Sequence, residues 1–407
     1  MRMGFTQGSR WMGMLAGACF GLLLALPQAK ASTSKPAVDW VRAWAAAPSF
    51  LPPSEKVFVG NQTLRQTVLL THAGQALRLR FSNRFGQVPL VIGAVTVAPV
   101  GEPQQVHQVT FGGADAVTIP AGVPWLSDVI SLPVTSMQQL EVSIYLPGRT
   151  ELSTVHWDQR NHTVISVAGD FSKTPSFLAT ADTPLRPFLS GVDVMPAGPT
   201  RVVVAFGDSI TDTDCRIGIV LCRWSDVLAS RLQAAGKNYA VANEAISGNR
   251  VLLDGYGKSA LERFDRDVLA VPGVSEVVML EGINDIGNSG GDLYGLQQSV
   301  ISAQALIAGY QQLIARAHQH GIKIIGCTMT PFAGAGYYSP AKDQVRKAAN
   351  RWIRDSGAFD GVVDFEPVVR DPAHPDRLLS SMDRGGHLHP NEAGQRAMGE
   401  AIDLHLF

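Results

Sequence analysis

Four short polar segments contain the residue types that a nucleophilic centre needs. Ser209 lies in FGDSITD, where a serine at the start of a helix exposes its hydroxyl and turns its backbone N–H toward a developing anion. Gly248 in EAISGNR lets its N–H approach a substrate oxygen, and Asn284 in LEGINDI offers a side-chain amide to the same oxygen. His389 in HLHPNEAG has the chemistry of a general base, and we interpret Asp208 as a residue that shapes the turn.

The elements around these segments predict how they are brought together. The first three segments follow apolar runs of strand length, such as RVVVAF, and His389 precedes a short helix. Residues 302–321 form a long amphipathic helix pattern between two such strands. Alternating strands and helices predict a parallel sheet covered on both sides, with ligands bound beyond the carboxyl ends of its strands.

The N-terminal half has a different pattern. Short alternating runs separated by Gly and Pro fill residues 40–193, and in QALRLRF the side chains of Leu77, Leu79 and Phe81 fall on one face, with two arginines on the other. This pattern predicts an antiparallel β-sandwich domain over residues 32–195. The Pro- and Gly-rich segment GVDVMPAGPTR is the predicted linker to an α/β domain over residues 196–407.

Residues 1–31 have the features of an export signal. Arg2 and Arg10 precede an apolar run and a small-residue pattern that ends at Ala31. The run is shorter than the roughly 20 residues that a membrane span requires, so we expect cleavage rather than a stable membrane anchor. We therefore expect a mature chain that begins near Ser32 and is secreted or periplasmic.

Composition excludes some classes of partner. The 407 residues are 45% hydrophobic and 17% charged, with a formal net charge of -1 and no long run of either sign. Such a chain buries a large core, and its charge gives no reason to expect nucleic acid or an anionic membrane surface. A small neutral partner is favoured.

The cysteines predict one disulfide and one buried thiol. Removal of the signal takes Cys19 with it and leaves Cys215 and Cys222 close in sequence, where an oxidising compartment favours a disulfide. Cys327 lies in an apolar run that predicts a buried, unpaired thiol. No spacing of Cys and His indicates a zinc site, so no metal is expected.

The four polar segments, taken in order, resemble those of the SGNH (GDSL-type) esterase and lipase superfamily over residues 201–406. The segments NQTLRQTV, LRLRFSNRFG and PLVIGAVTVA also resemble the β-domain that precedes the hydrolase domain in a secreted branch of this superfamily. The resemblance implies a flavodoxin-like three-layer α/β/α hydrolase domain without metal or organic cofactor. It further implies Ser209 as nucleophile, His389 as general base, and an oxyanion hole made by the N–H groups of Ser209 and Gly248 and the side chain of Asn284.

The sequence departs from the family pattern before the histidine. The family places an Asp three residues before the catalytic His, where this chain has Gly386. One hypothesis is that Asp383 orients His389 from the turn DRGG. A second is that a backbone carbonyl or a water does so and leaves a Ser-His dyad. The third is a poorly active protein that lacks the acid.

These observations predict a secreted serine esterase that acts on short acyl, lipid or carbohydrate O-acetyl esters, with polyester as a further substrate class. Tyr337 and Tyr338 in TPFAGAGYYSP are the predicted substrate-binding rim, and Trp40 and Trp44 are interpreted as packing residues. Two alternatives stay open: an O-acyltransferase, and a non-catalytic carbohydrate-binding protein on the same scaffold.

Overall fold

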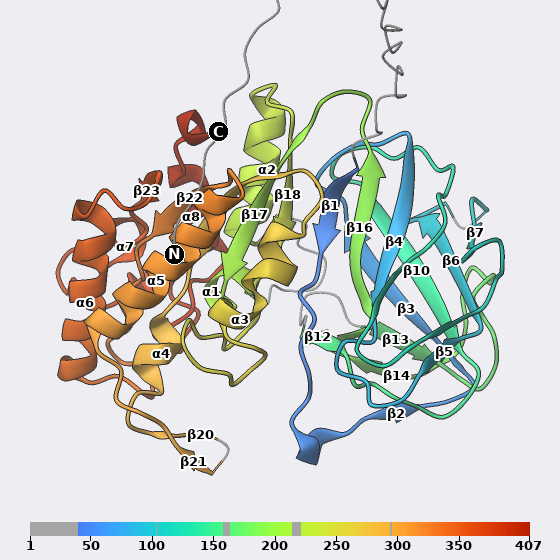
Figure 1. Cartoon of the computed structure of the whole chain (residues 1–407), viewed down its shortest axis with the longest axis horizontal. Coiled ribbons are helices and arrows are strands. Elements are labelled where there is room, and N and C mark those ends of the chain that lie inside the picture. The colour runs from blue at the N-terminus through green and yellow to red at the C-terminus, as the bar shows by residue number, and fades with distance from the viewer. Residues whose placement is uncertain (1–39, 103, 158–162, 214–220, 294) are drawn as a thin grey trace, which may run out of the picture. The chain divides into compact units, whose positions relative to one another are not determined.

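A five-stranded parallel sheet organises the C-terminal region, residues 201–407, of the computed structural model (Figure 1). The strands are ordered β18-β17-β19-β22-β23, so the first strand along the chain lies between the second and the third, as in flavodoxin-like folds. The predicted parallel sheet is confirmed. Its strands are β17 (Arg201–Gly207), β18 (Tyr239–Asn243), β19 (Val274–Leu280), β22 (Lys323–Cys327) and β23 (Gly361–Val363).

The structure describes residues 40–102, 104–157, 163–213, 221–293 and 295–407. All of them lie in one compact unit, Val38–Phe407. The predicted export signal, residues 1–31, lies outside the described residues, and so do Cys19 and Cys215. Within the described ranges, no helix has the length and apolar character needed to cross a membrane.

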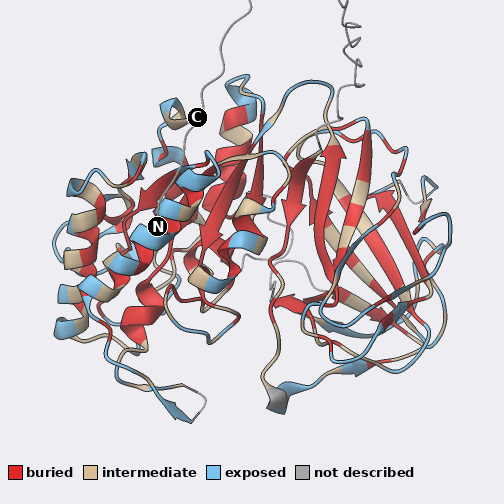
Figure 2. Ribbon diagram, in the orientation of Figure 1, coloured by how far each residue is buried: buried red, intermediate tan, exposed pale blue. Residues whose placement is uncertain are grey.

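The parallel strands are apolar because helices cover them. Val202, Val203 and Val204 of β17 are completely buried, as expected of a strand with both faces covered. Figure 2 shows buried strands in this region and helices that expose their outer faces. The longer helices are α2 (Trp224–Ala234), α5 (Ala303–Gln319), α6 (Pro340–Asp355) and α8 (Glu392–Ala401).

Helix α5 is the amphipathic helix predicted over residues 302–321. The Ser302 side chain caps it by accepting the N–H of Ala305, and Leu306, Tyr310 and Leu313 form its buried face. Helix α5 contacts α6 and β22, whereas α2 contacts α8 and β18. The shorter helical elements are α1 (Ser209–Asp212), α3 (Ala260–Phe264), α4 (Ile283–Gly287), α7 (Glu366–Val369), η2 (Asp265–Leu269), η3 (Ser380–Met382) and η4 (Leu404–Leu406).

The N-terminal region, residues 40–195, is built from antiparallel strands, as predicted. One sheet has the order β1-β16-β4-β9 and another has β14-β13-β3-β10-β6-β7. Their strands are β1 (Val41–Ala45), β16 (Leu189–Met195), β4 (Ala76–Ser82), β9 (Pro124–Leu126), β14 (Ala179–Thr183), β13 (Thr163–Ser166), β3 (Gln62–Leu69), β10 (Gln139–Leu146), β6 (Ala94–Pro99) and β7 (His107–Val109). The packing of the two sheets as a sandwich stays a prediction.

Short two-stranded pairs complete the described strands. They are β11 (Thr150–Glu151) with β2 (Phe58–Val59), β12 (Val155–Trp157) with β15 (Leu185–Pro187), β5 (Leu90–Ile92) with β8 (Val117–Ile119), and β20 (Asp292–Leu293) with β21 (Leu296–Gln297). A short helix, η1 (Pro53–Glu55), lies between β1 and β2.

Strand β4 has the alternation that the sequence predicts. Leu77, Leu79 and Phe81 are completely buried, while the two arginines between them are only partly buried. Trp44 is buried beneath the Arg186 guanidinium, which supports the interpretation of this residue as a packing residue.

The predicted linker contributes to the core. Residues 191–195 of GVDVMPAGPTR belong to β16, whose backbone pairs with both β1 and β4. Buried Arg42 of β1 contacts Asp193 of β16 at 2.5 Å and Glu244, just after β18, at 3.3 Å. The domain boundary near residue 195 stays a prediction, and ion pairs connect the residues on either side of it.

We predict that Asp193→Asn lowers the free energy of unfolding by about 3–5 kcal/mol, because buried Asp193 is the acceptor for both Arg42 and Arg78. Urea denaturation measures the change. The control is Glu400→Gln, which removes an exposed pair with Arg396 at 3.9 Å and should change stability by less than about 0.5 kcal/mol. Equal effects of the two substitutions would contradict the prediction.

Candidate active site

Ser209 and His389 are in direct contact. Ser209 begins α1 immediately after β17, and its Oγ lies 2.8 Å from Nε2 of His389. Asp208 is the N-cap of α1, and its carboxylate accepts the N–H of Ile210 at 2.9 Å. The structure therefore places the predicted nucleophile within hydrogen-bonding distance of the predicted base, across 180 residues of sequence.

The loop before α8 presents His389. Its backbone carbonyl accepts the N–H of Arg384 at 3.1 Å. Asn391 caps α8 through the N–H groups of Ala393 and Gly394, and its own amide donates to the carbonyl of Ser381 at 3.0 Å. These bonds fix the position of the histidine relative to the helix that follows it.

Gly248 lies in the left-handed region, with φ of +77°. A Cβ atom at this position would meet the Tyr256 ring at 2.6 Å, so both the backbone and the packing require glycine. Among the hydrogen bonds of the described residues, none uses the N–H of Gly248 or of Ser209. Both donors are therefore available to a ligand in the cavity that these residues line.

Asn284 lies in α4, just after β19, and is held from two sides. Its Nδ2 donates to the carbonyl of Asn249 at 3.0 Å, and its Oδ1 accepts the hydroxyl of Tyr337 at 3.4 Å. Because the amide carries two hydrogens, this arrangement commits one of them and leaves the second for the cavity. Ser209, Gly248 and Asn284 thus offer three donors at one cavity.

The Asp383 carboxylate contacts His387 rather than His389, the predicted partner. Its Oδ2 lies 2.6 Å from Nδ1 of His387, and its Oδ1 accepts the N–H groups of Gly385 and His387. These contacts correct the hypothesis that Asp383 orients His389. Asp383 instead shapes the loop that carries His389, and the other two accounts of the missing acid stay predictions.

Neither Tyr337 nor Tyr338 lines the cavity at Ser209, which corrects their prediction as its rim. The Tyr337 hydroxyl contacts Asn284 on the side chain's acceptor oxygen, and the Tyr338 ring packs edge-on against Phe332. Tyr337 therefore holds the side chain of Asn284, the predicted oxyanion donor, and Tyr338 packs against Phe332.

The cavity at Ser209 has a volume of about 690 Å³. Its walls combine residues of the C-terminal region with two segments of the N-terminal region, residues 49–52 and β12. The residue types and spacings of the chain do not indicate these walls, although Phe50 is the last residue of the aromatic segment WVRAWAAAPSF. The lining residues include Phe50, Leu51, Pro52, Glu55, Val155, His156, Trp157, Ile246, Ser247, Tyr256, Arg384, Gly386 and Leu388.

Buried Asp212 connects the nucleophile helix to these walls. Its Oδ1 lies 3.1 Å from Nε2 of His156 in β12 and 3.1 Å from the Arg223 guanidinium. Its Oδ2 accepts the Ser247 hydroxyl at 3.0 Å, next to Gly248. A single carboxylate thus joins α1, the glycine loop and β12.

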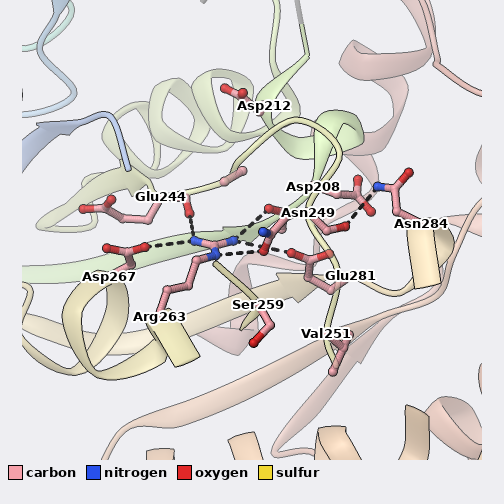
Figure 3. A network of polar contacts seen from close by, with 12 residues as sticks. Asp208, Asp212, Glu244, Asn249, Val251, Ser259, Arg263, Asp267, Glu281 and Asn284 are labelled. Atoms are coloured by element: carbon pink, nitrogen blue, oxygen red, sulfur yellow. Dashed lines mark hydrogen bonds and ion pairs between the residues drawn. The ribbon is translucent and has the colours of Figure 1, made fainter. Parts of the chain in front are cut away.

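Arg263 is the centre of a buried polar network (Figure 3). Its guanidinium satisfies groups at the ends of three neighbouring strands and in the loop after Gly248. These acceptors are the carbonyls of Gly207 and Glu244, the side chain of Asn249, and the carboxylates of Asp267 and Glu281.

Several carboxyl groups near the network are buried, and their pKa values are raised. Burial raises the pKa of Asp208 to about 7, although the N–H of Ile210 opposes the shift. Burial also raises the pKa of Asp285 to about 6, against hydrogen bonds from the N–H groups of Val251 and Leu252. The pKa of Glu281 is raised for the same reason. Each of these groups therefore keeps its proton to a higher pH than an exposed carboxyl does, because water does not solvate its charge.

The described residues contain no group of three or more His, Cys, Asp or Glu that could hold a metal ion. Cys327 is a buried free thiol, as predicted, and burial raises its pKa. The predicted Cys215–Cys222 disulfide involves a residue outside the described ranges and stays a prediction.

We predict that Asp208→Asn weakens the pH dependence of stability. The folded-state pKa is about 7, whereas an unfolded aspartate has a pKa of about 3.9. Between these values the unfolded state releases the proton and the folded state retains it, so this carboxyl makes the protein less stable as pH rises from about 4 to about 7. Asparagine keeps a side-chain oxygen that can accept the N–H of Ile210, but it has no carboxyl proton that titrates.

The free energy of unfolding of Asp208→Asn should therefore fall less than that of the unchanged protein over this interval. Urea denaturation in steps of half a pH unit measures both profiles. Asp403→Asn alters an exposed cap of η4 and provides the matched control. Parallel profiles for the unchanged protein and Asp208→Asn would refute the prediction.

Comparison with known proteins relates the C-terminal region to a family of lipases and acylhydrolases. The model of the GDSL-like lipase/acylhydrolase family matches residues 205–397. Similar solved structures include a lipolytic protein of the G-D-S-L family from Desulfitobacterium hafniense (21% identity, 50% of this chain and 97% of that chain covered, TM-score 0.38). Another is a GDSL-like lipase from Bacteroides thetaiotaomicron (19% identity, 51% and 87% covered, TM-score 0.37).

A mutant of an acetyl-xylooligosaccharide esterase from Geobacillus is also similar (21% identity, 50% of this chain and 93% of that chain covered, TM-score 0.39). Among curated proteins, none matches the chain. The matched segment contains Ser209, Gly248, Asn284 and His389, the residues that line one cavity. Residues 205–397 therefore match the domain of this family, which confirms the resemblance that the four polar segments predicted.

Proposed function

We propose that this protein is an exported serine esterase that hydrolyses carboxylic esters through an acyl-enzyme, with a three-layer α/β/α hydrolase domain behind an N-terminal β-sandwich. The observation that carries the proposal is the 2.8 Å contact between Ser209 Oγ and His389 Nε2 in a cavity that also exposes oxyanion donors. Export is supported by the signal pattern of residues 1–31.

Acylation uses the contact between Ser209 and His389. The Oγ of Ser209 attacks the ester carbonyl carbon while Nε2 of His389 takes the hydroxyl proton. The tetrahedral intermediate then collapses, and the imidazolium gives this proton to the oxygen of the leaving alcohol. Water repeats the two steps on the acyl-enzyme, so an acid is released and Ser209 is restored.

The oxyanion forms where the donors converge. The N–H of Ser209, the N–H of Gly248 and the free amide hydrogen of Asn284 face the cavity, and Asn249 and Tyr337 fix the amide. These donors are oriented before the substrate binds, so their stabilisation of the developing negative charge costs little reorganisation.

The cavity supports a substrate class that includes more than acetyl esters. Its volume of about 690 Å³ is in the range of small-molecule sites. Phe50, Leu51 and Ile246 give it an apolar wall, whereas Arg384 and Glu55 are polar residues of the lining. We therefore propose short acyl esters, lipid esters and carbohydrate O-acetyl esters as substrates, with polyester surfaces as a further class.

We predict that Ser209→Ala abolishes turnover of p-nitrophenyl acetate and p-nitrophenyl octanoate, because it removes the attacking oxygen. Release of p-nitrophenol by the purified protein measures turnover. Ser131→Ala, at an exposed serine of the N-terminal region, should leave it unchanged. If the unchanged protein does not exceed Ser209→Ala on any tested ester, the esterase proposal fails and carbohydrate binding without catalysis becomes the alternative.

We predict that Asn284→Ala lowers kcat by about 10²–10³ with a smaller change in KM, because a donor to the oxyanion acts mainly in the transition state. Steady-state kinetics with p-nitrophenyl acetate separate the two constants. Asn288→Ala, in the residue after the same helix, should lower kcat less than about threefold, since its amide donates only to the carbonyl of Asn284. Similar losses in both variants would indicate a structural role for Asn284.

A further inference from the structure

A second cavity lies apart from the one at Ser209 and shares no lining residue with it. Its volume is about 80 Å³, which corresponds to a few water molecules or one small anion. Residues of both regions line it, including Arg80 of β4 and Arg266 of η2.

The lining is rich in guanidinium groups. Arg42, Arg80, Arg84 and Arg266 contribute positive charge, and the described residues of the lining include two carboxylates, Glu244 and Asp267. Burial and then the nearby Asp267 raise the pKa of Glu244 to about 8, which further reduces the negative charge near neutral pH. Asp193, outside the lining, balances Arg42 at 2.5 Å, and Glu262 lies 3.8 Å from Arg84, so the unbalanced positive charge at the cavity comes chiefly from Arg80.

Arg80 lacks a partner for its charge. Its guanidinium has no hydrogen bond and no ion pair within 4.0 Å among the described residues, although the side chain is partly buried. Burial and the neighbouring Arg42 lower its pKa. A guanidinium removed from water without a partner is unfavourable, so an anion at this position would stabilise the fold.

Arg266 adds a second uncommitted donor. Its Nε and one terminal nitrogen contact Asp267, and that nitrogen also donates to the carbonyl of Pro48 at 3.3 Å. The other terminal nitrogen, Nη1, is buried and has no hydrogen-bond partner among the described residues. The buried Ser82 also lines the cavity, and its hydroxyl oxygen accepts the N–H of Arg84.

We infer that this cavity binds a small tetrahedral oxyanion of the phosphate or sulfate class. The planar Arg80 guanidinium offers two N–H groups to adjacent oxygens of the anion, and Nη1 of Arg266 offers a third donor from another element. Ser82 adds a hydroxyl whose hydrogen is free to rotate toward an acceptor. The anion joins β4 of the N-terminal region to η2 of the C-terminal region.

The bound anion acts on stability rather than on the chemical step. Arg266 binds Asp267, and Asp267 binds Arg263 at 3.2 Å, so the cavity is connected to the polar network beside the catalytic cavity. A ligand that binds only the folded state raises the free energy of unfolding as its concentration increases.

The test is thermal unfolding and calorimetric titration of the whole protein with sodium phosphate, sodium sulfate and sodium acetate, each at the ionic strength of a sodium chloride reference. Saturable binding of phosphate or sulfate, with a rise in Tm that chloride does not give, supports the site. The absence of saturable binding overturns it. Tighter binding of acetate than of either tetrahedral anion overturns the assignment to this class.

Variants locate the binding. Arg80→Met should weaken phosphate or sulfate binding at least tenfold, and Arg80→Lys should weaken it less because it retains the charge without the planar fork. Arg351→Met, at an exposed arginine of α6, should bind as the unchanged protein does. Equal affinity of Arg80→Met and the unchanged protein would overturn the site; Arg80→Lys supplies the same comparison if the methionine variant does not fold.

Discussion

The buried guanidinium of Arg263 is the interaction on which the site depends. It donates to the carbonyls of Gly207 and Glu244 and to the carboxylate of Glu281, so it joins the ends of β17, β18 and β19. A bond to Asn249 extends this support to the residue whose carbonyl holds Asn284. A fully buried cation requires a complete set of acceptors. Here those acceptors lie in the segments that carry Ser209, Gly248 and Asn284.

Local patterns predicted the elements that contact mainly their own neighbours. The continuous apolar run of β17 and the alternation of Leu77, Leu79 and Phe81 in β4 both became buried strands as expected. Ser209 and Asn284 were identified because strand ends in a parallel sheet meet at one edge. The cavity walls at Phe50 and His156 could not be predicted, because their approach to Ser209 depends on contacts between regions distant in sequence.

The corrections at Asp383 and Tyr337 show a second limit on what the spacing of residues in a sequence can predict. Asp383 is close enough in sequence to serve either His387 or His389, and the choice is made by the loop. Left-handed φ angles at Gly385 and His387 turn the chain between them, so the carboxylate meets the nearer histidine. Tyr337 was expected at the rim and instead buttresses Asn284, because the direction of a side chain in an irregular loop has no periodic signal.

Two regions of the sequence contribute different parts of the cavity at Ser209. The proposed nucleophile, base and oxyanion donors all come from residues 205–397, whereas residues 49–52 and 155–157 form part of the lining of the same cavity. On the proposed function, substitutions at Phe50 or Leu51 change which esters fit, whereas His156 also contacts Asp212 of α1 and so supports the site itself. If the proposed function holds, the N-terminal segments are the part of the cavity in which substitutions can change substrate preference while Ser209 and His389 stay constant.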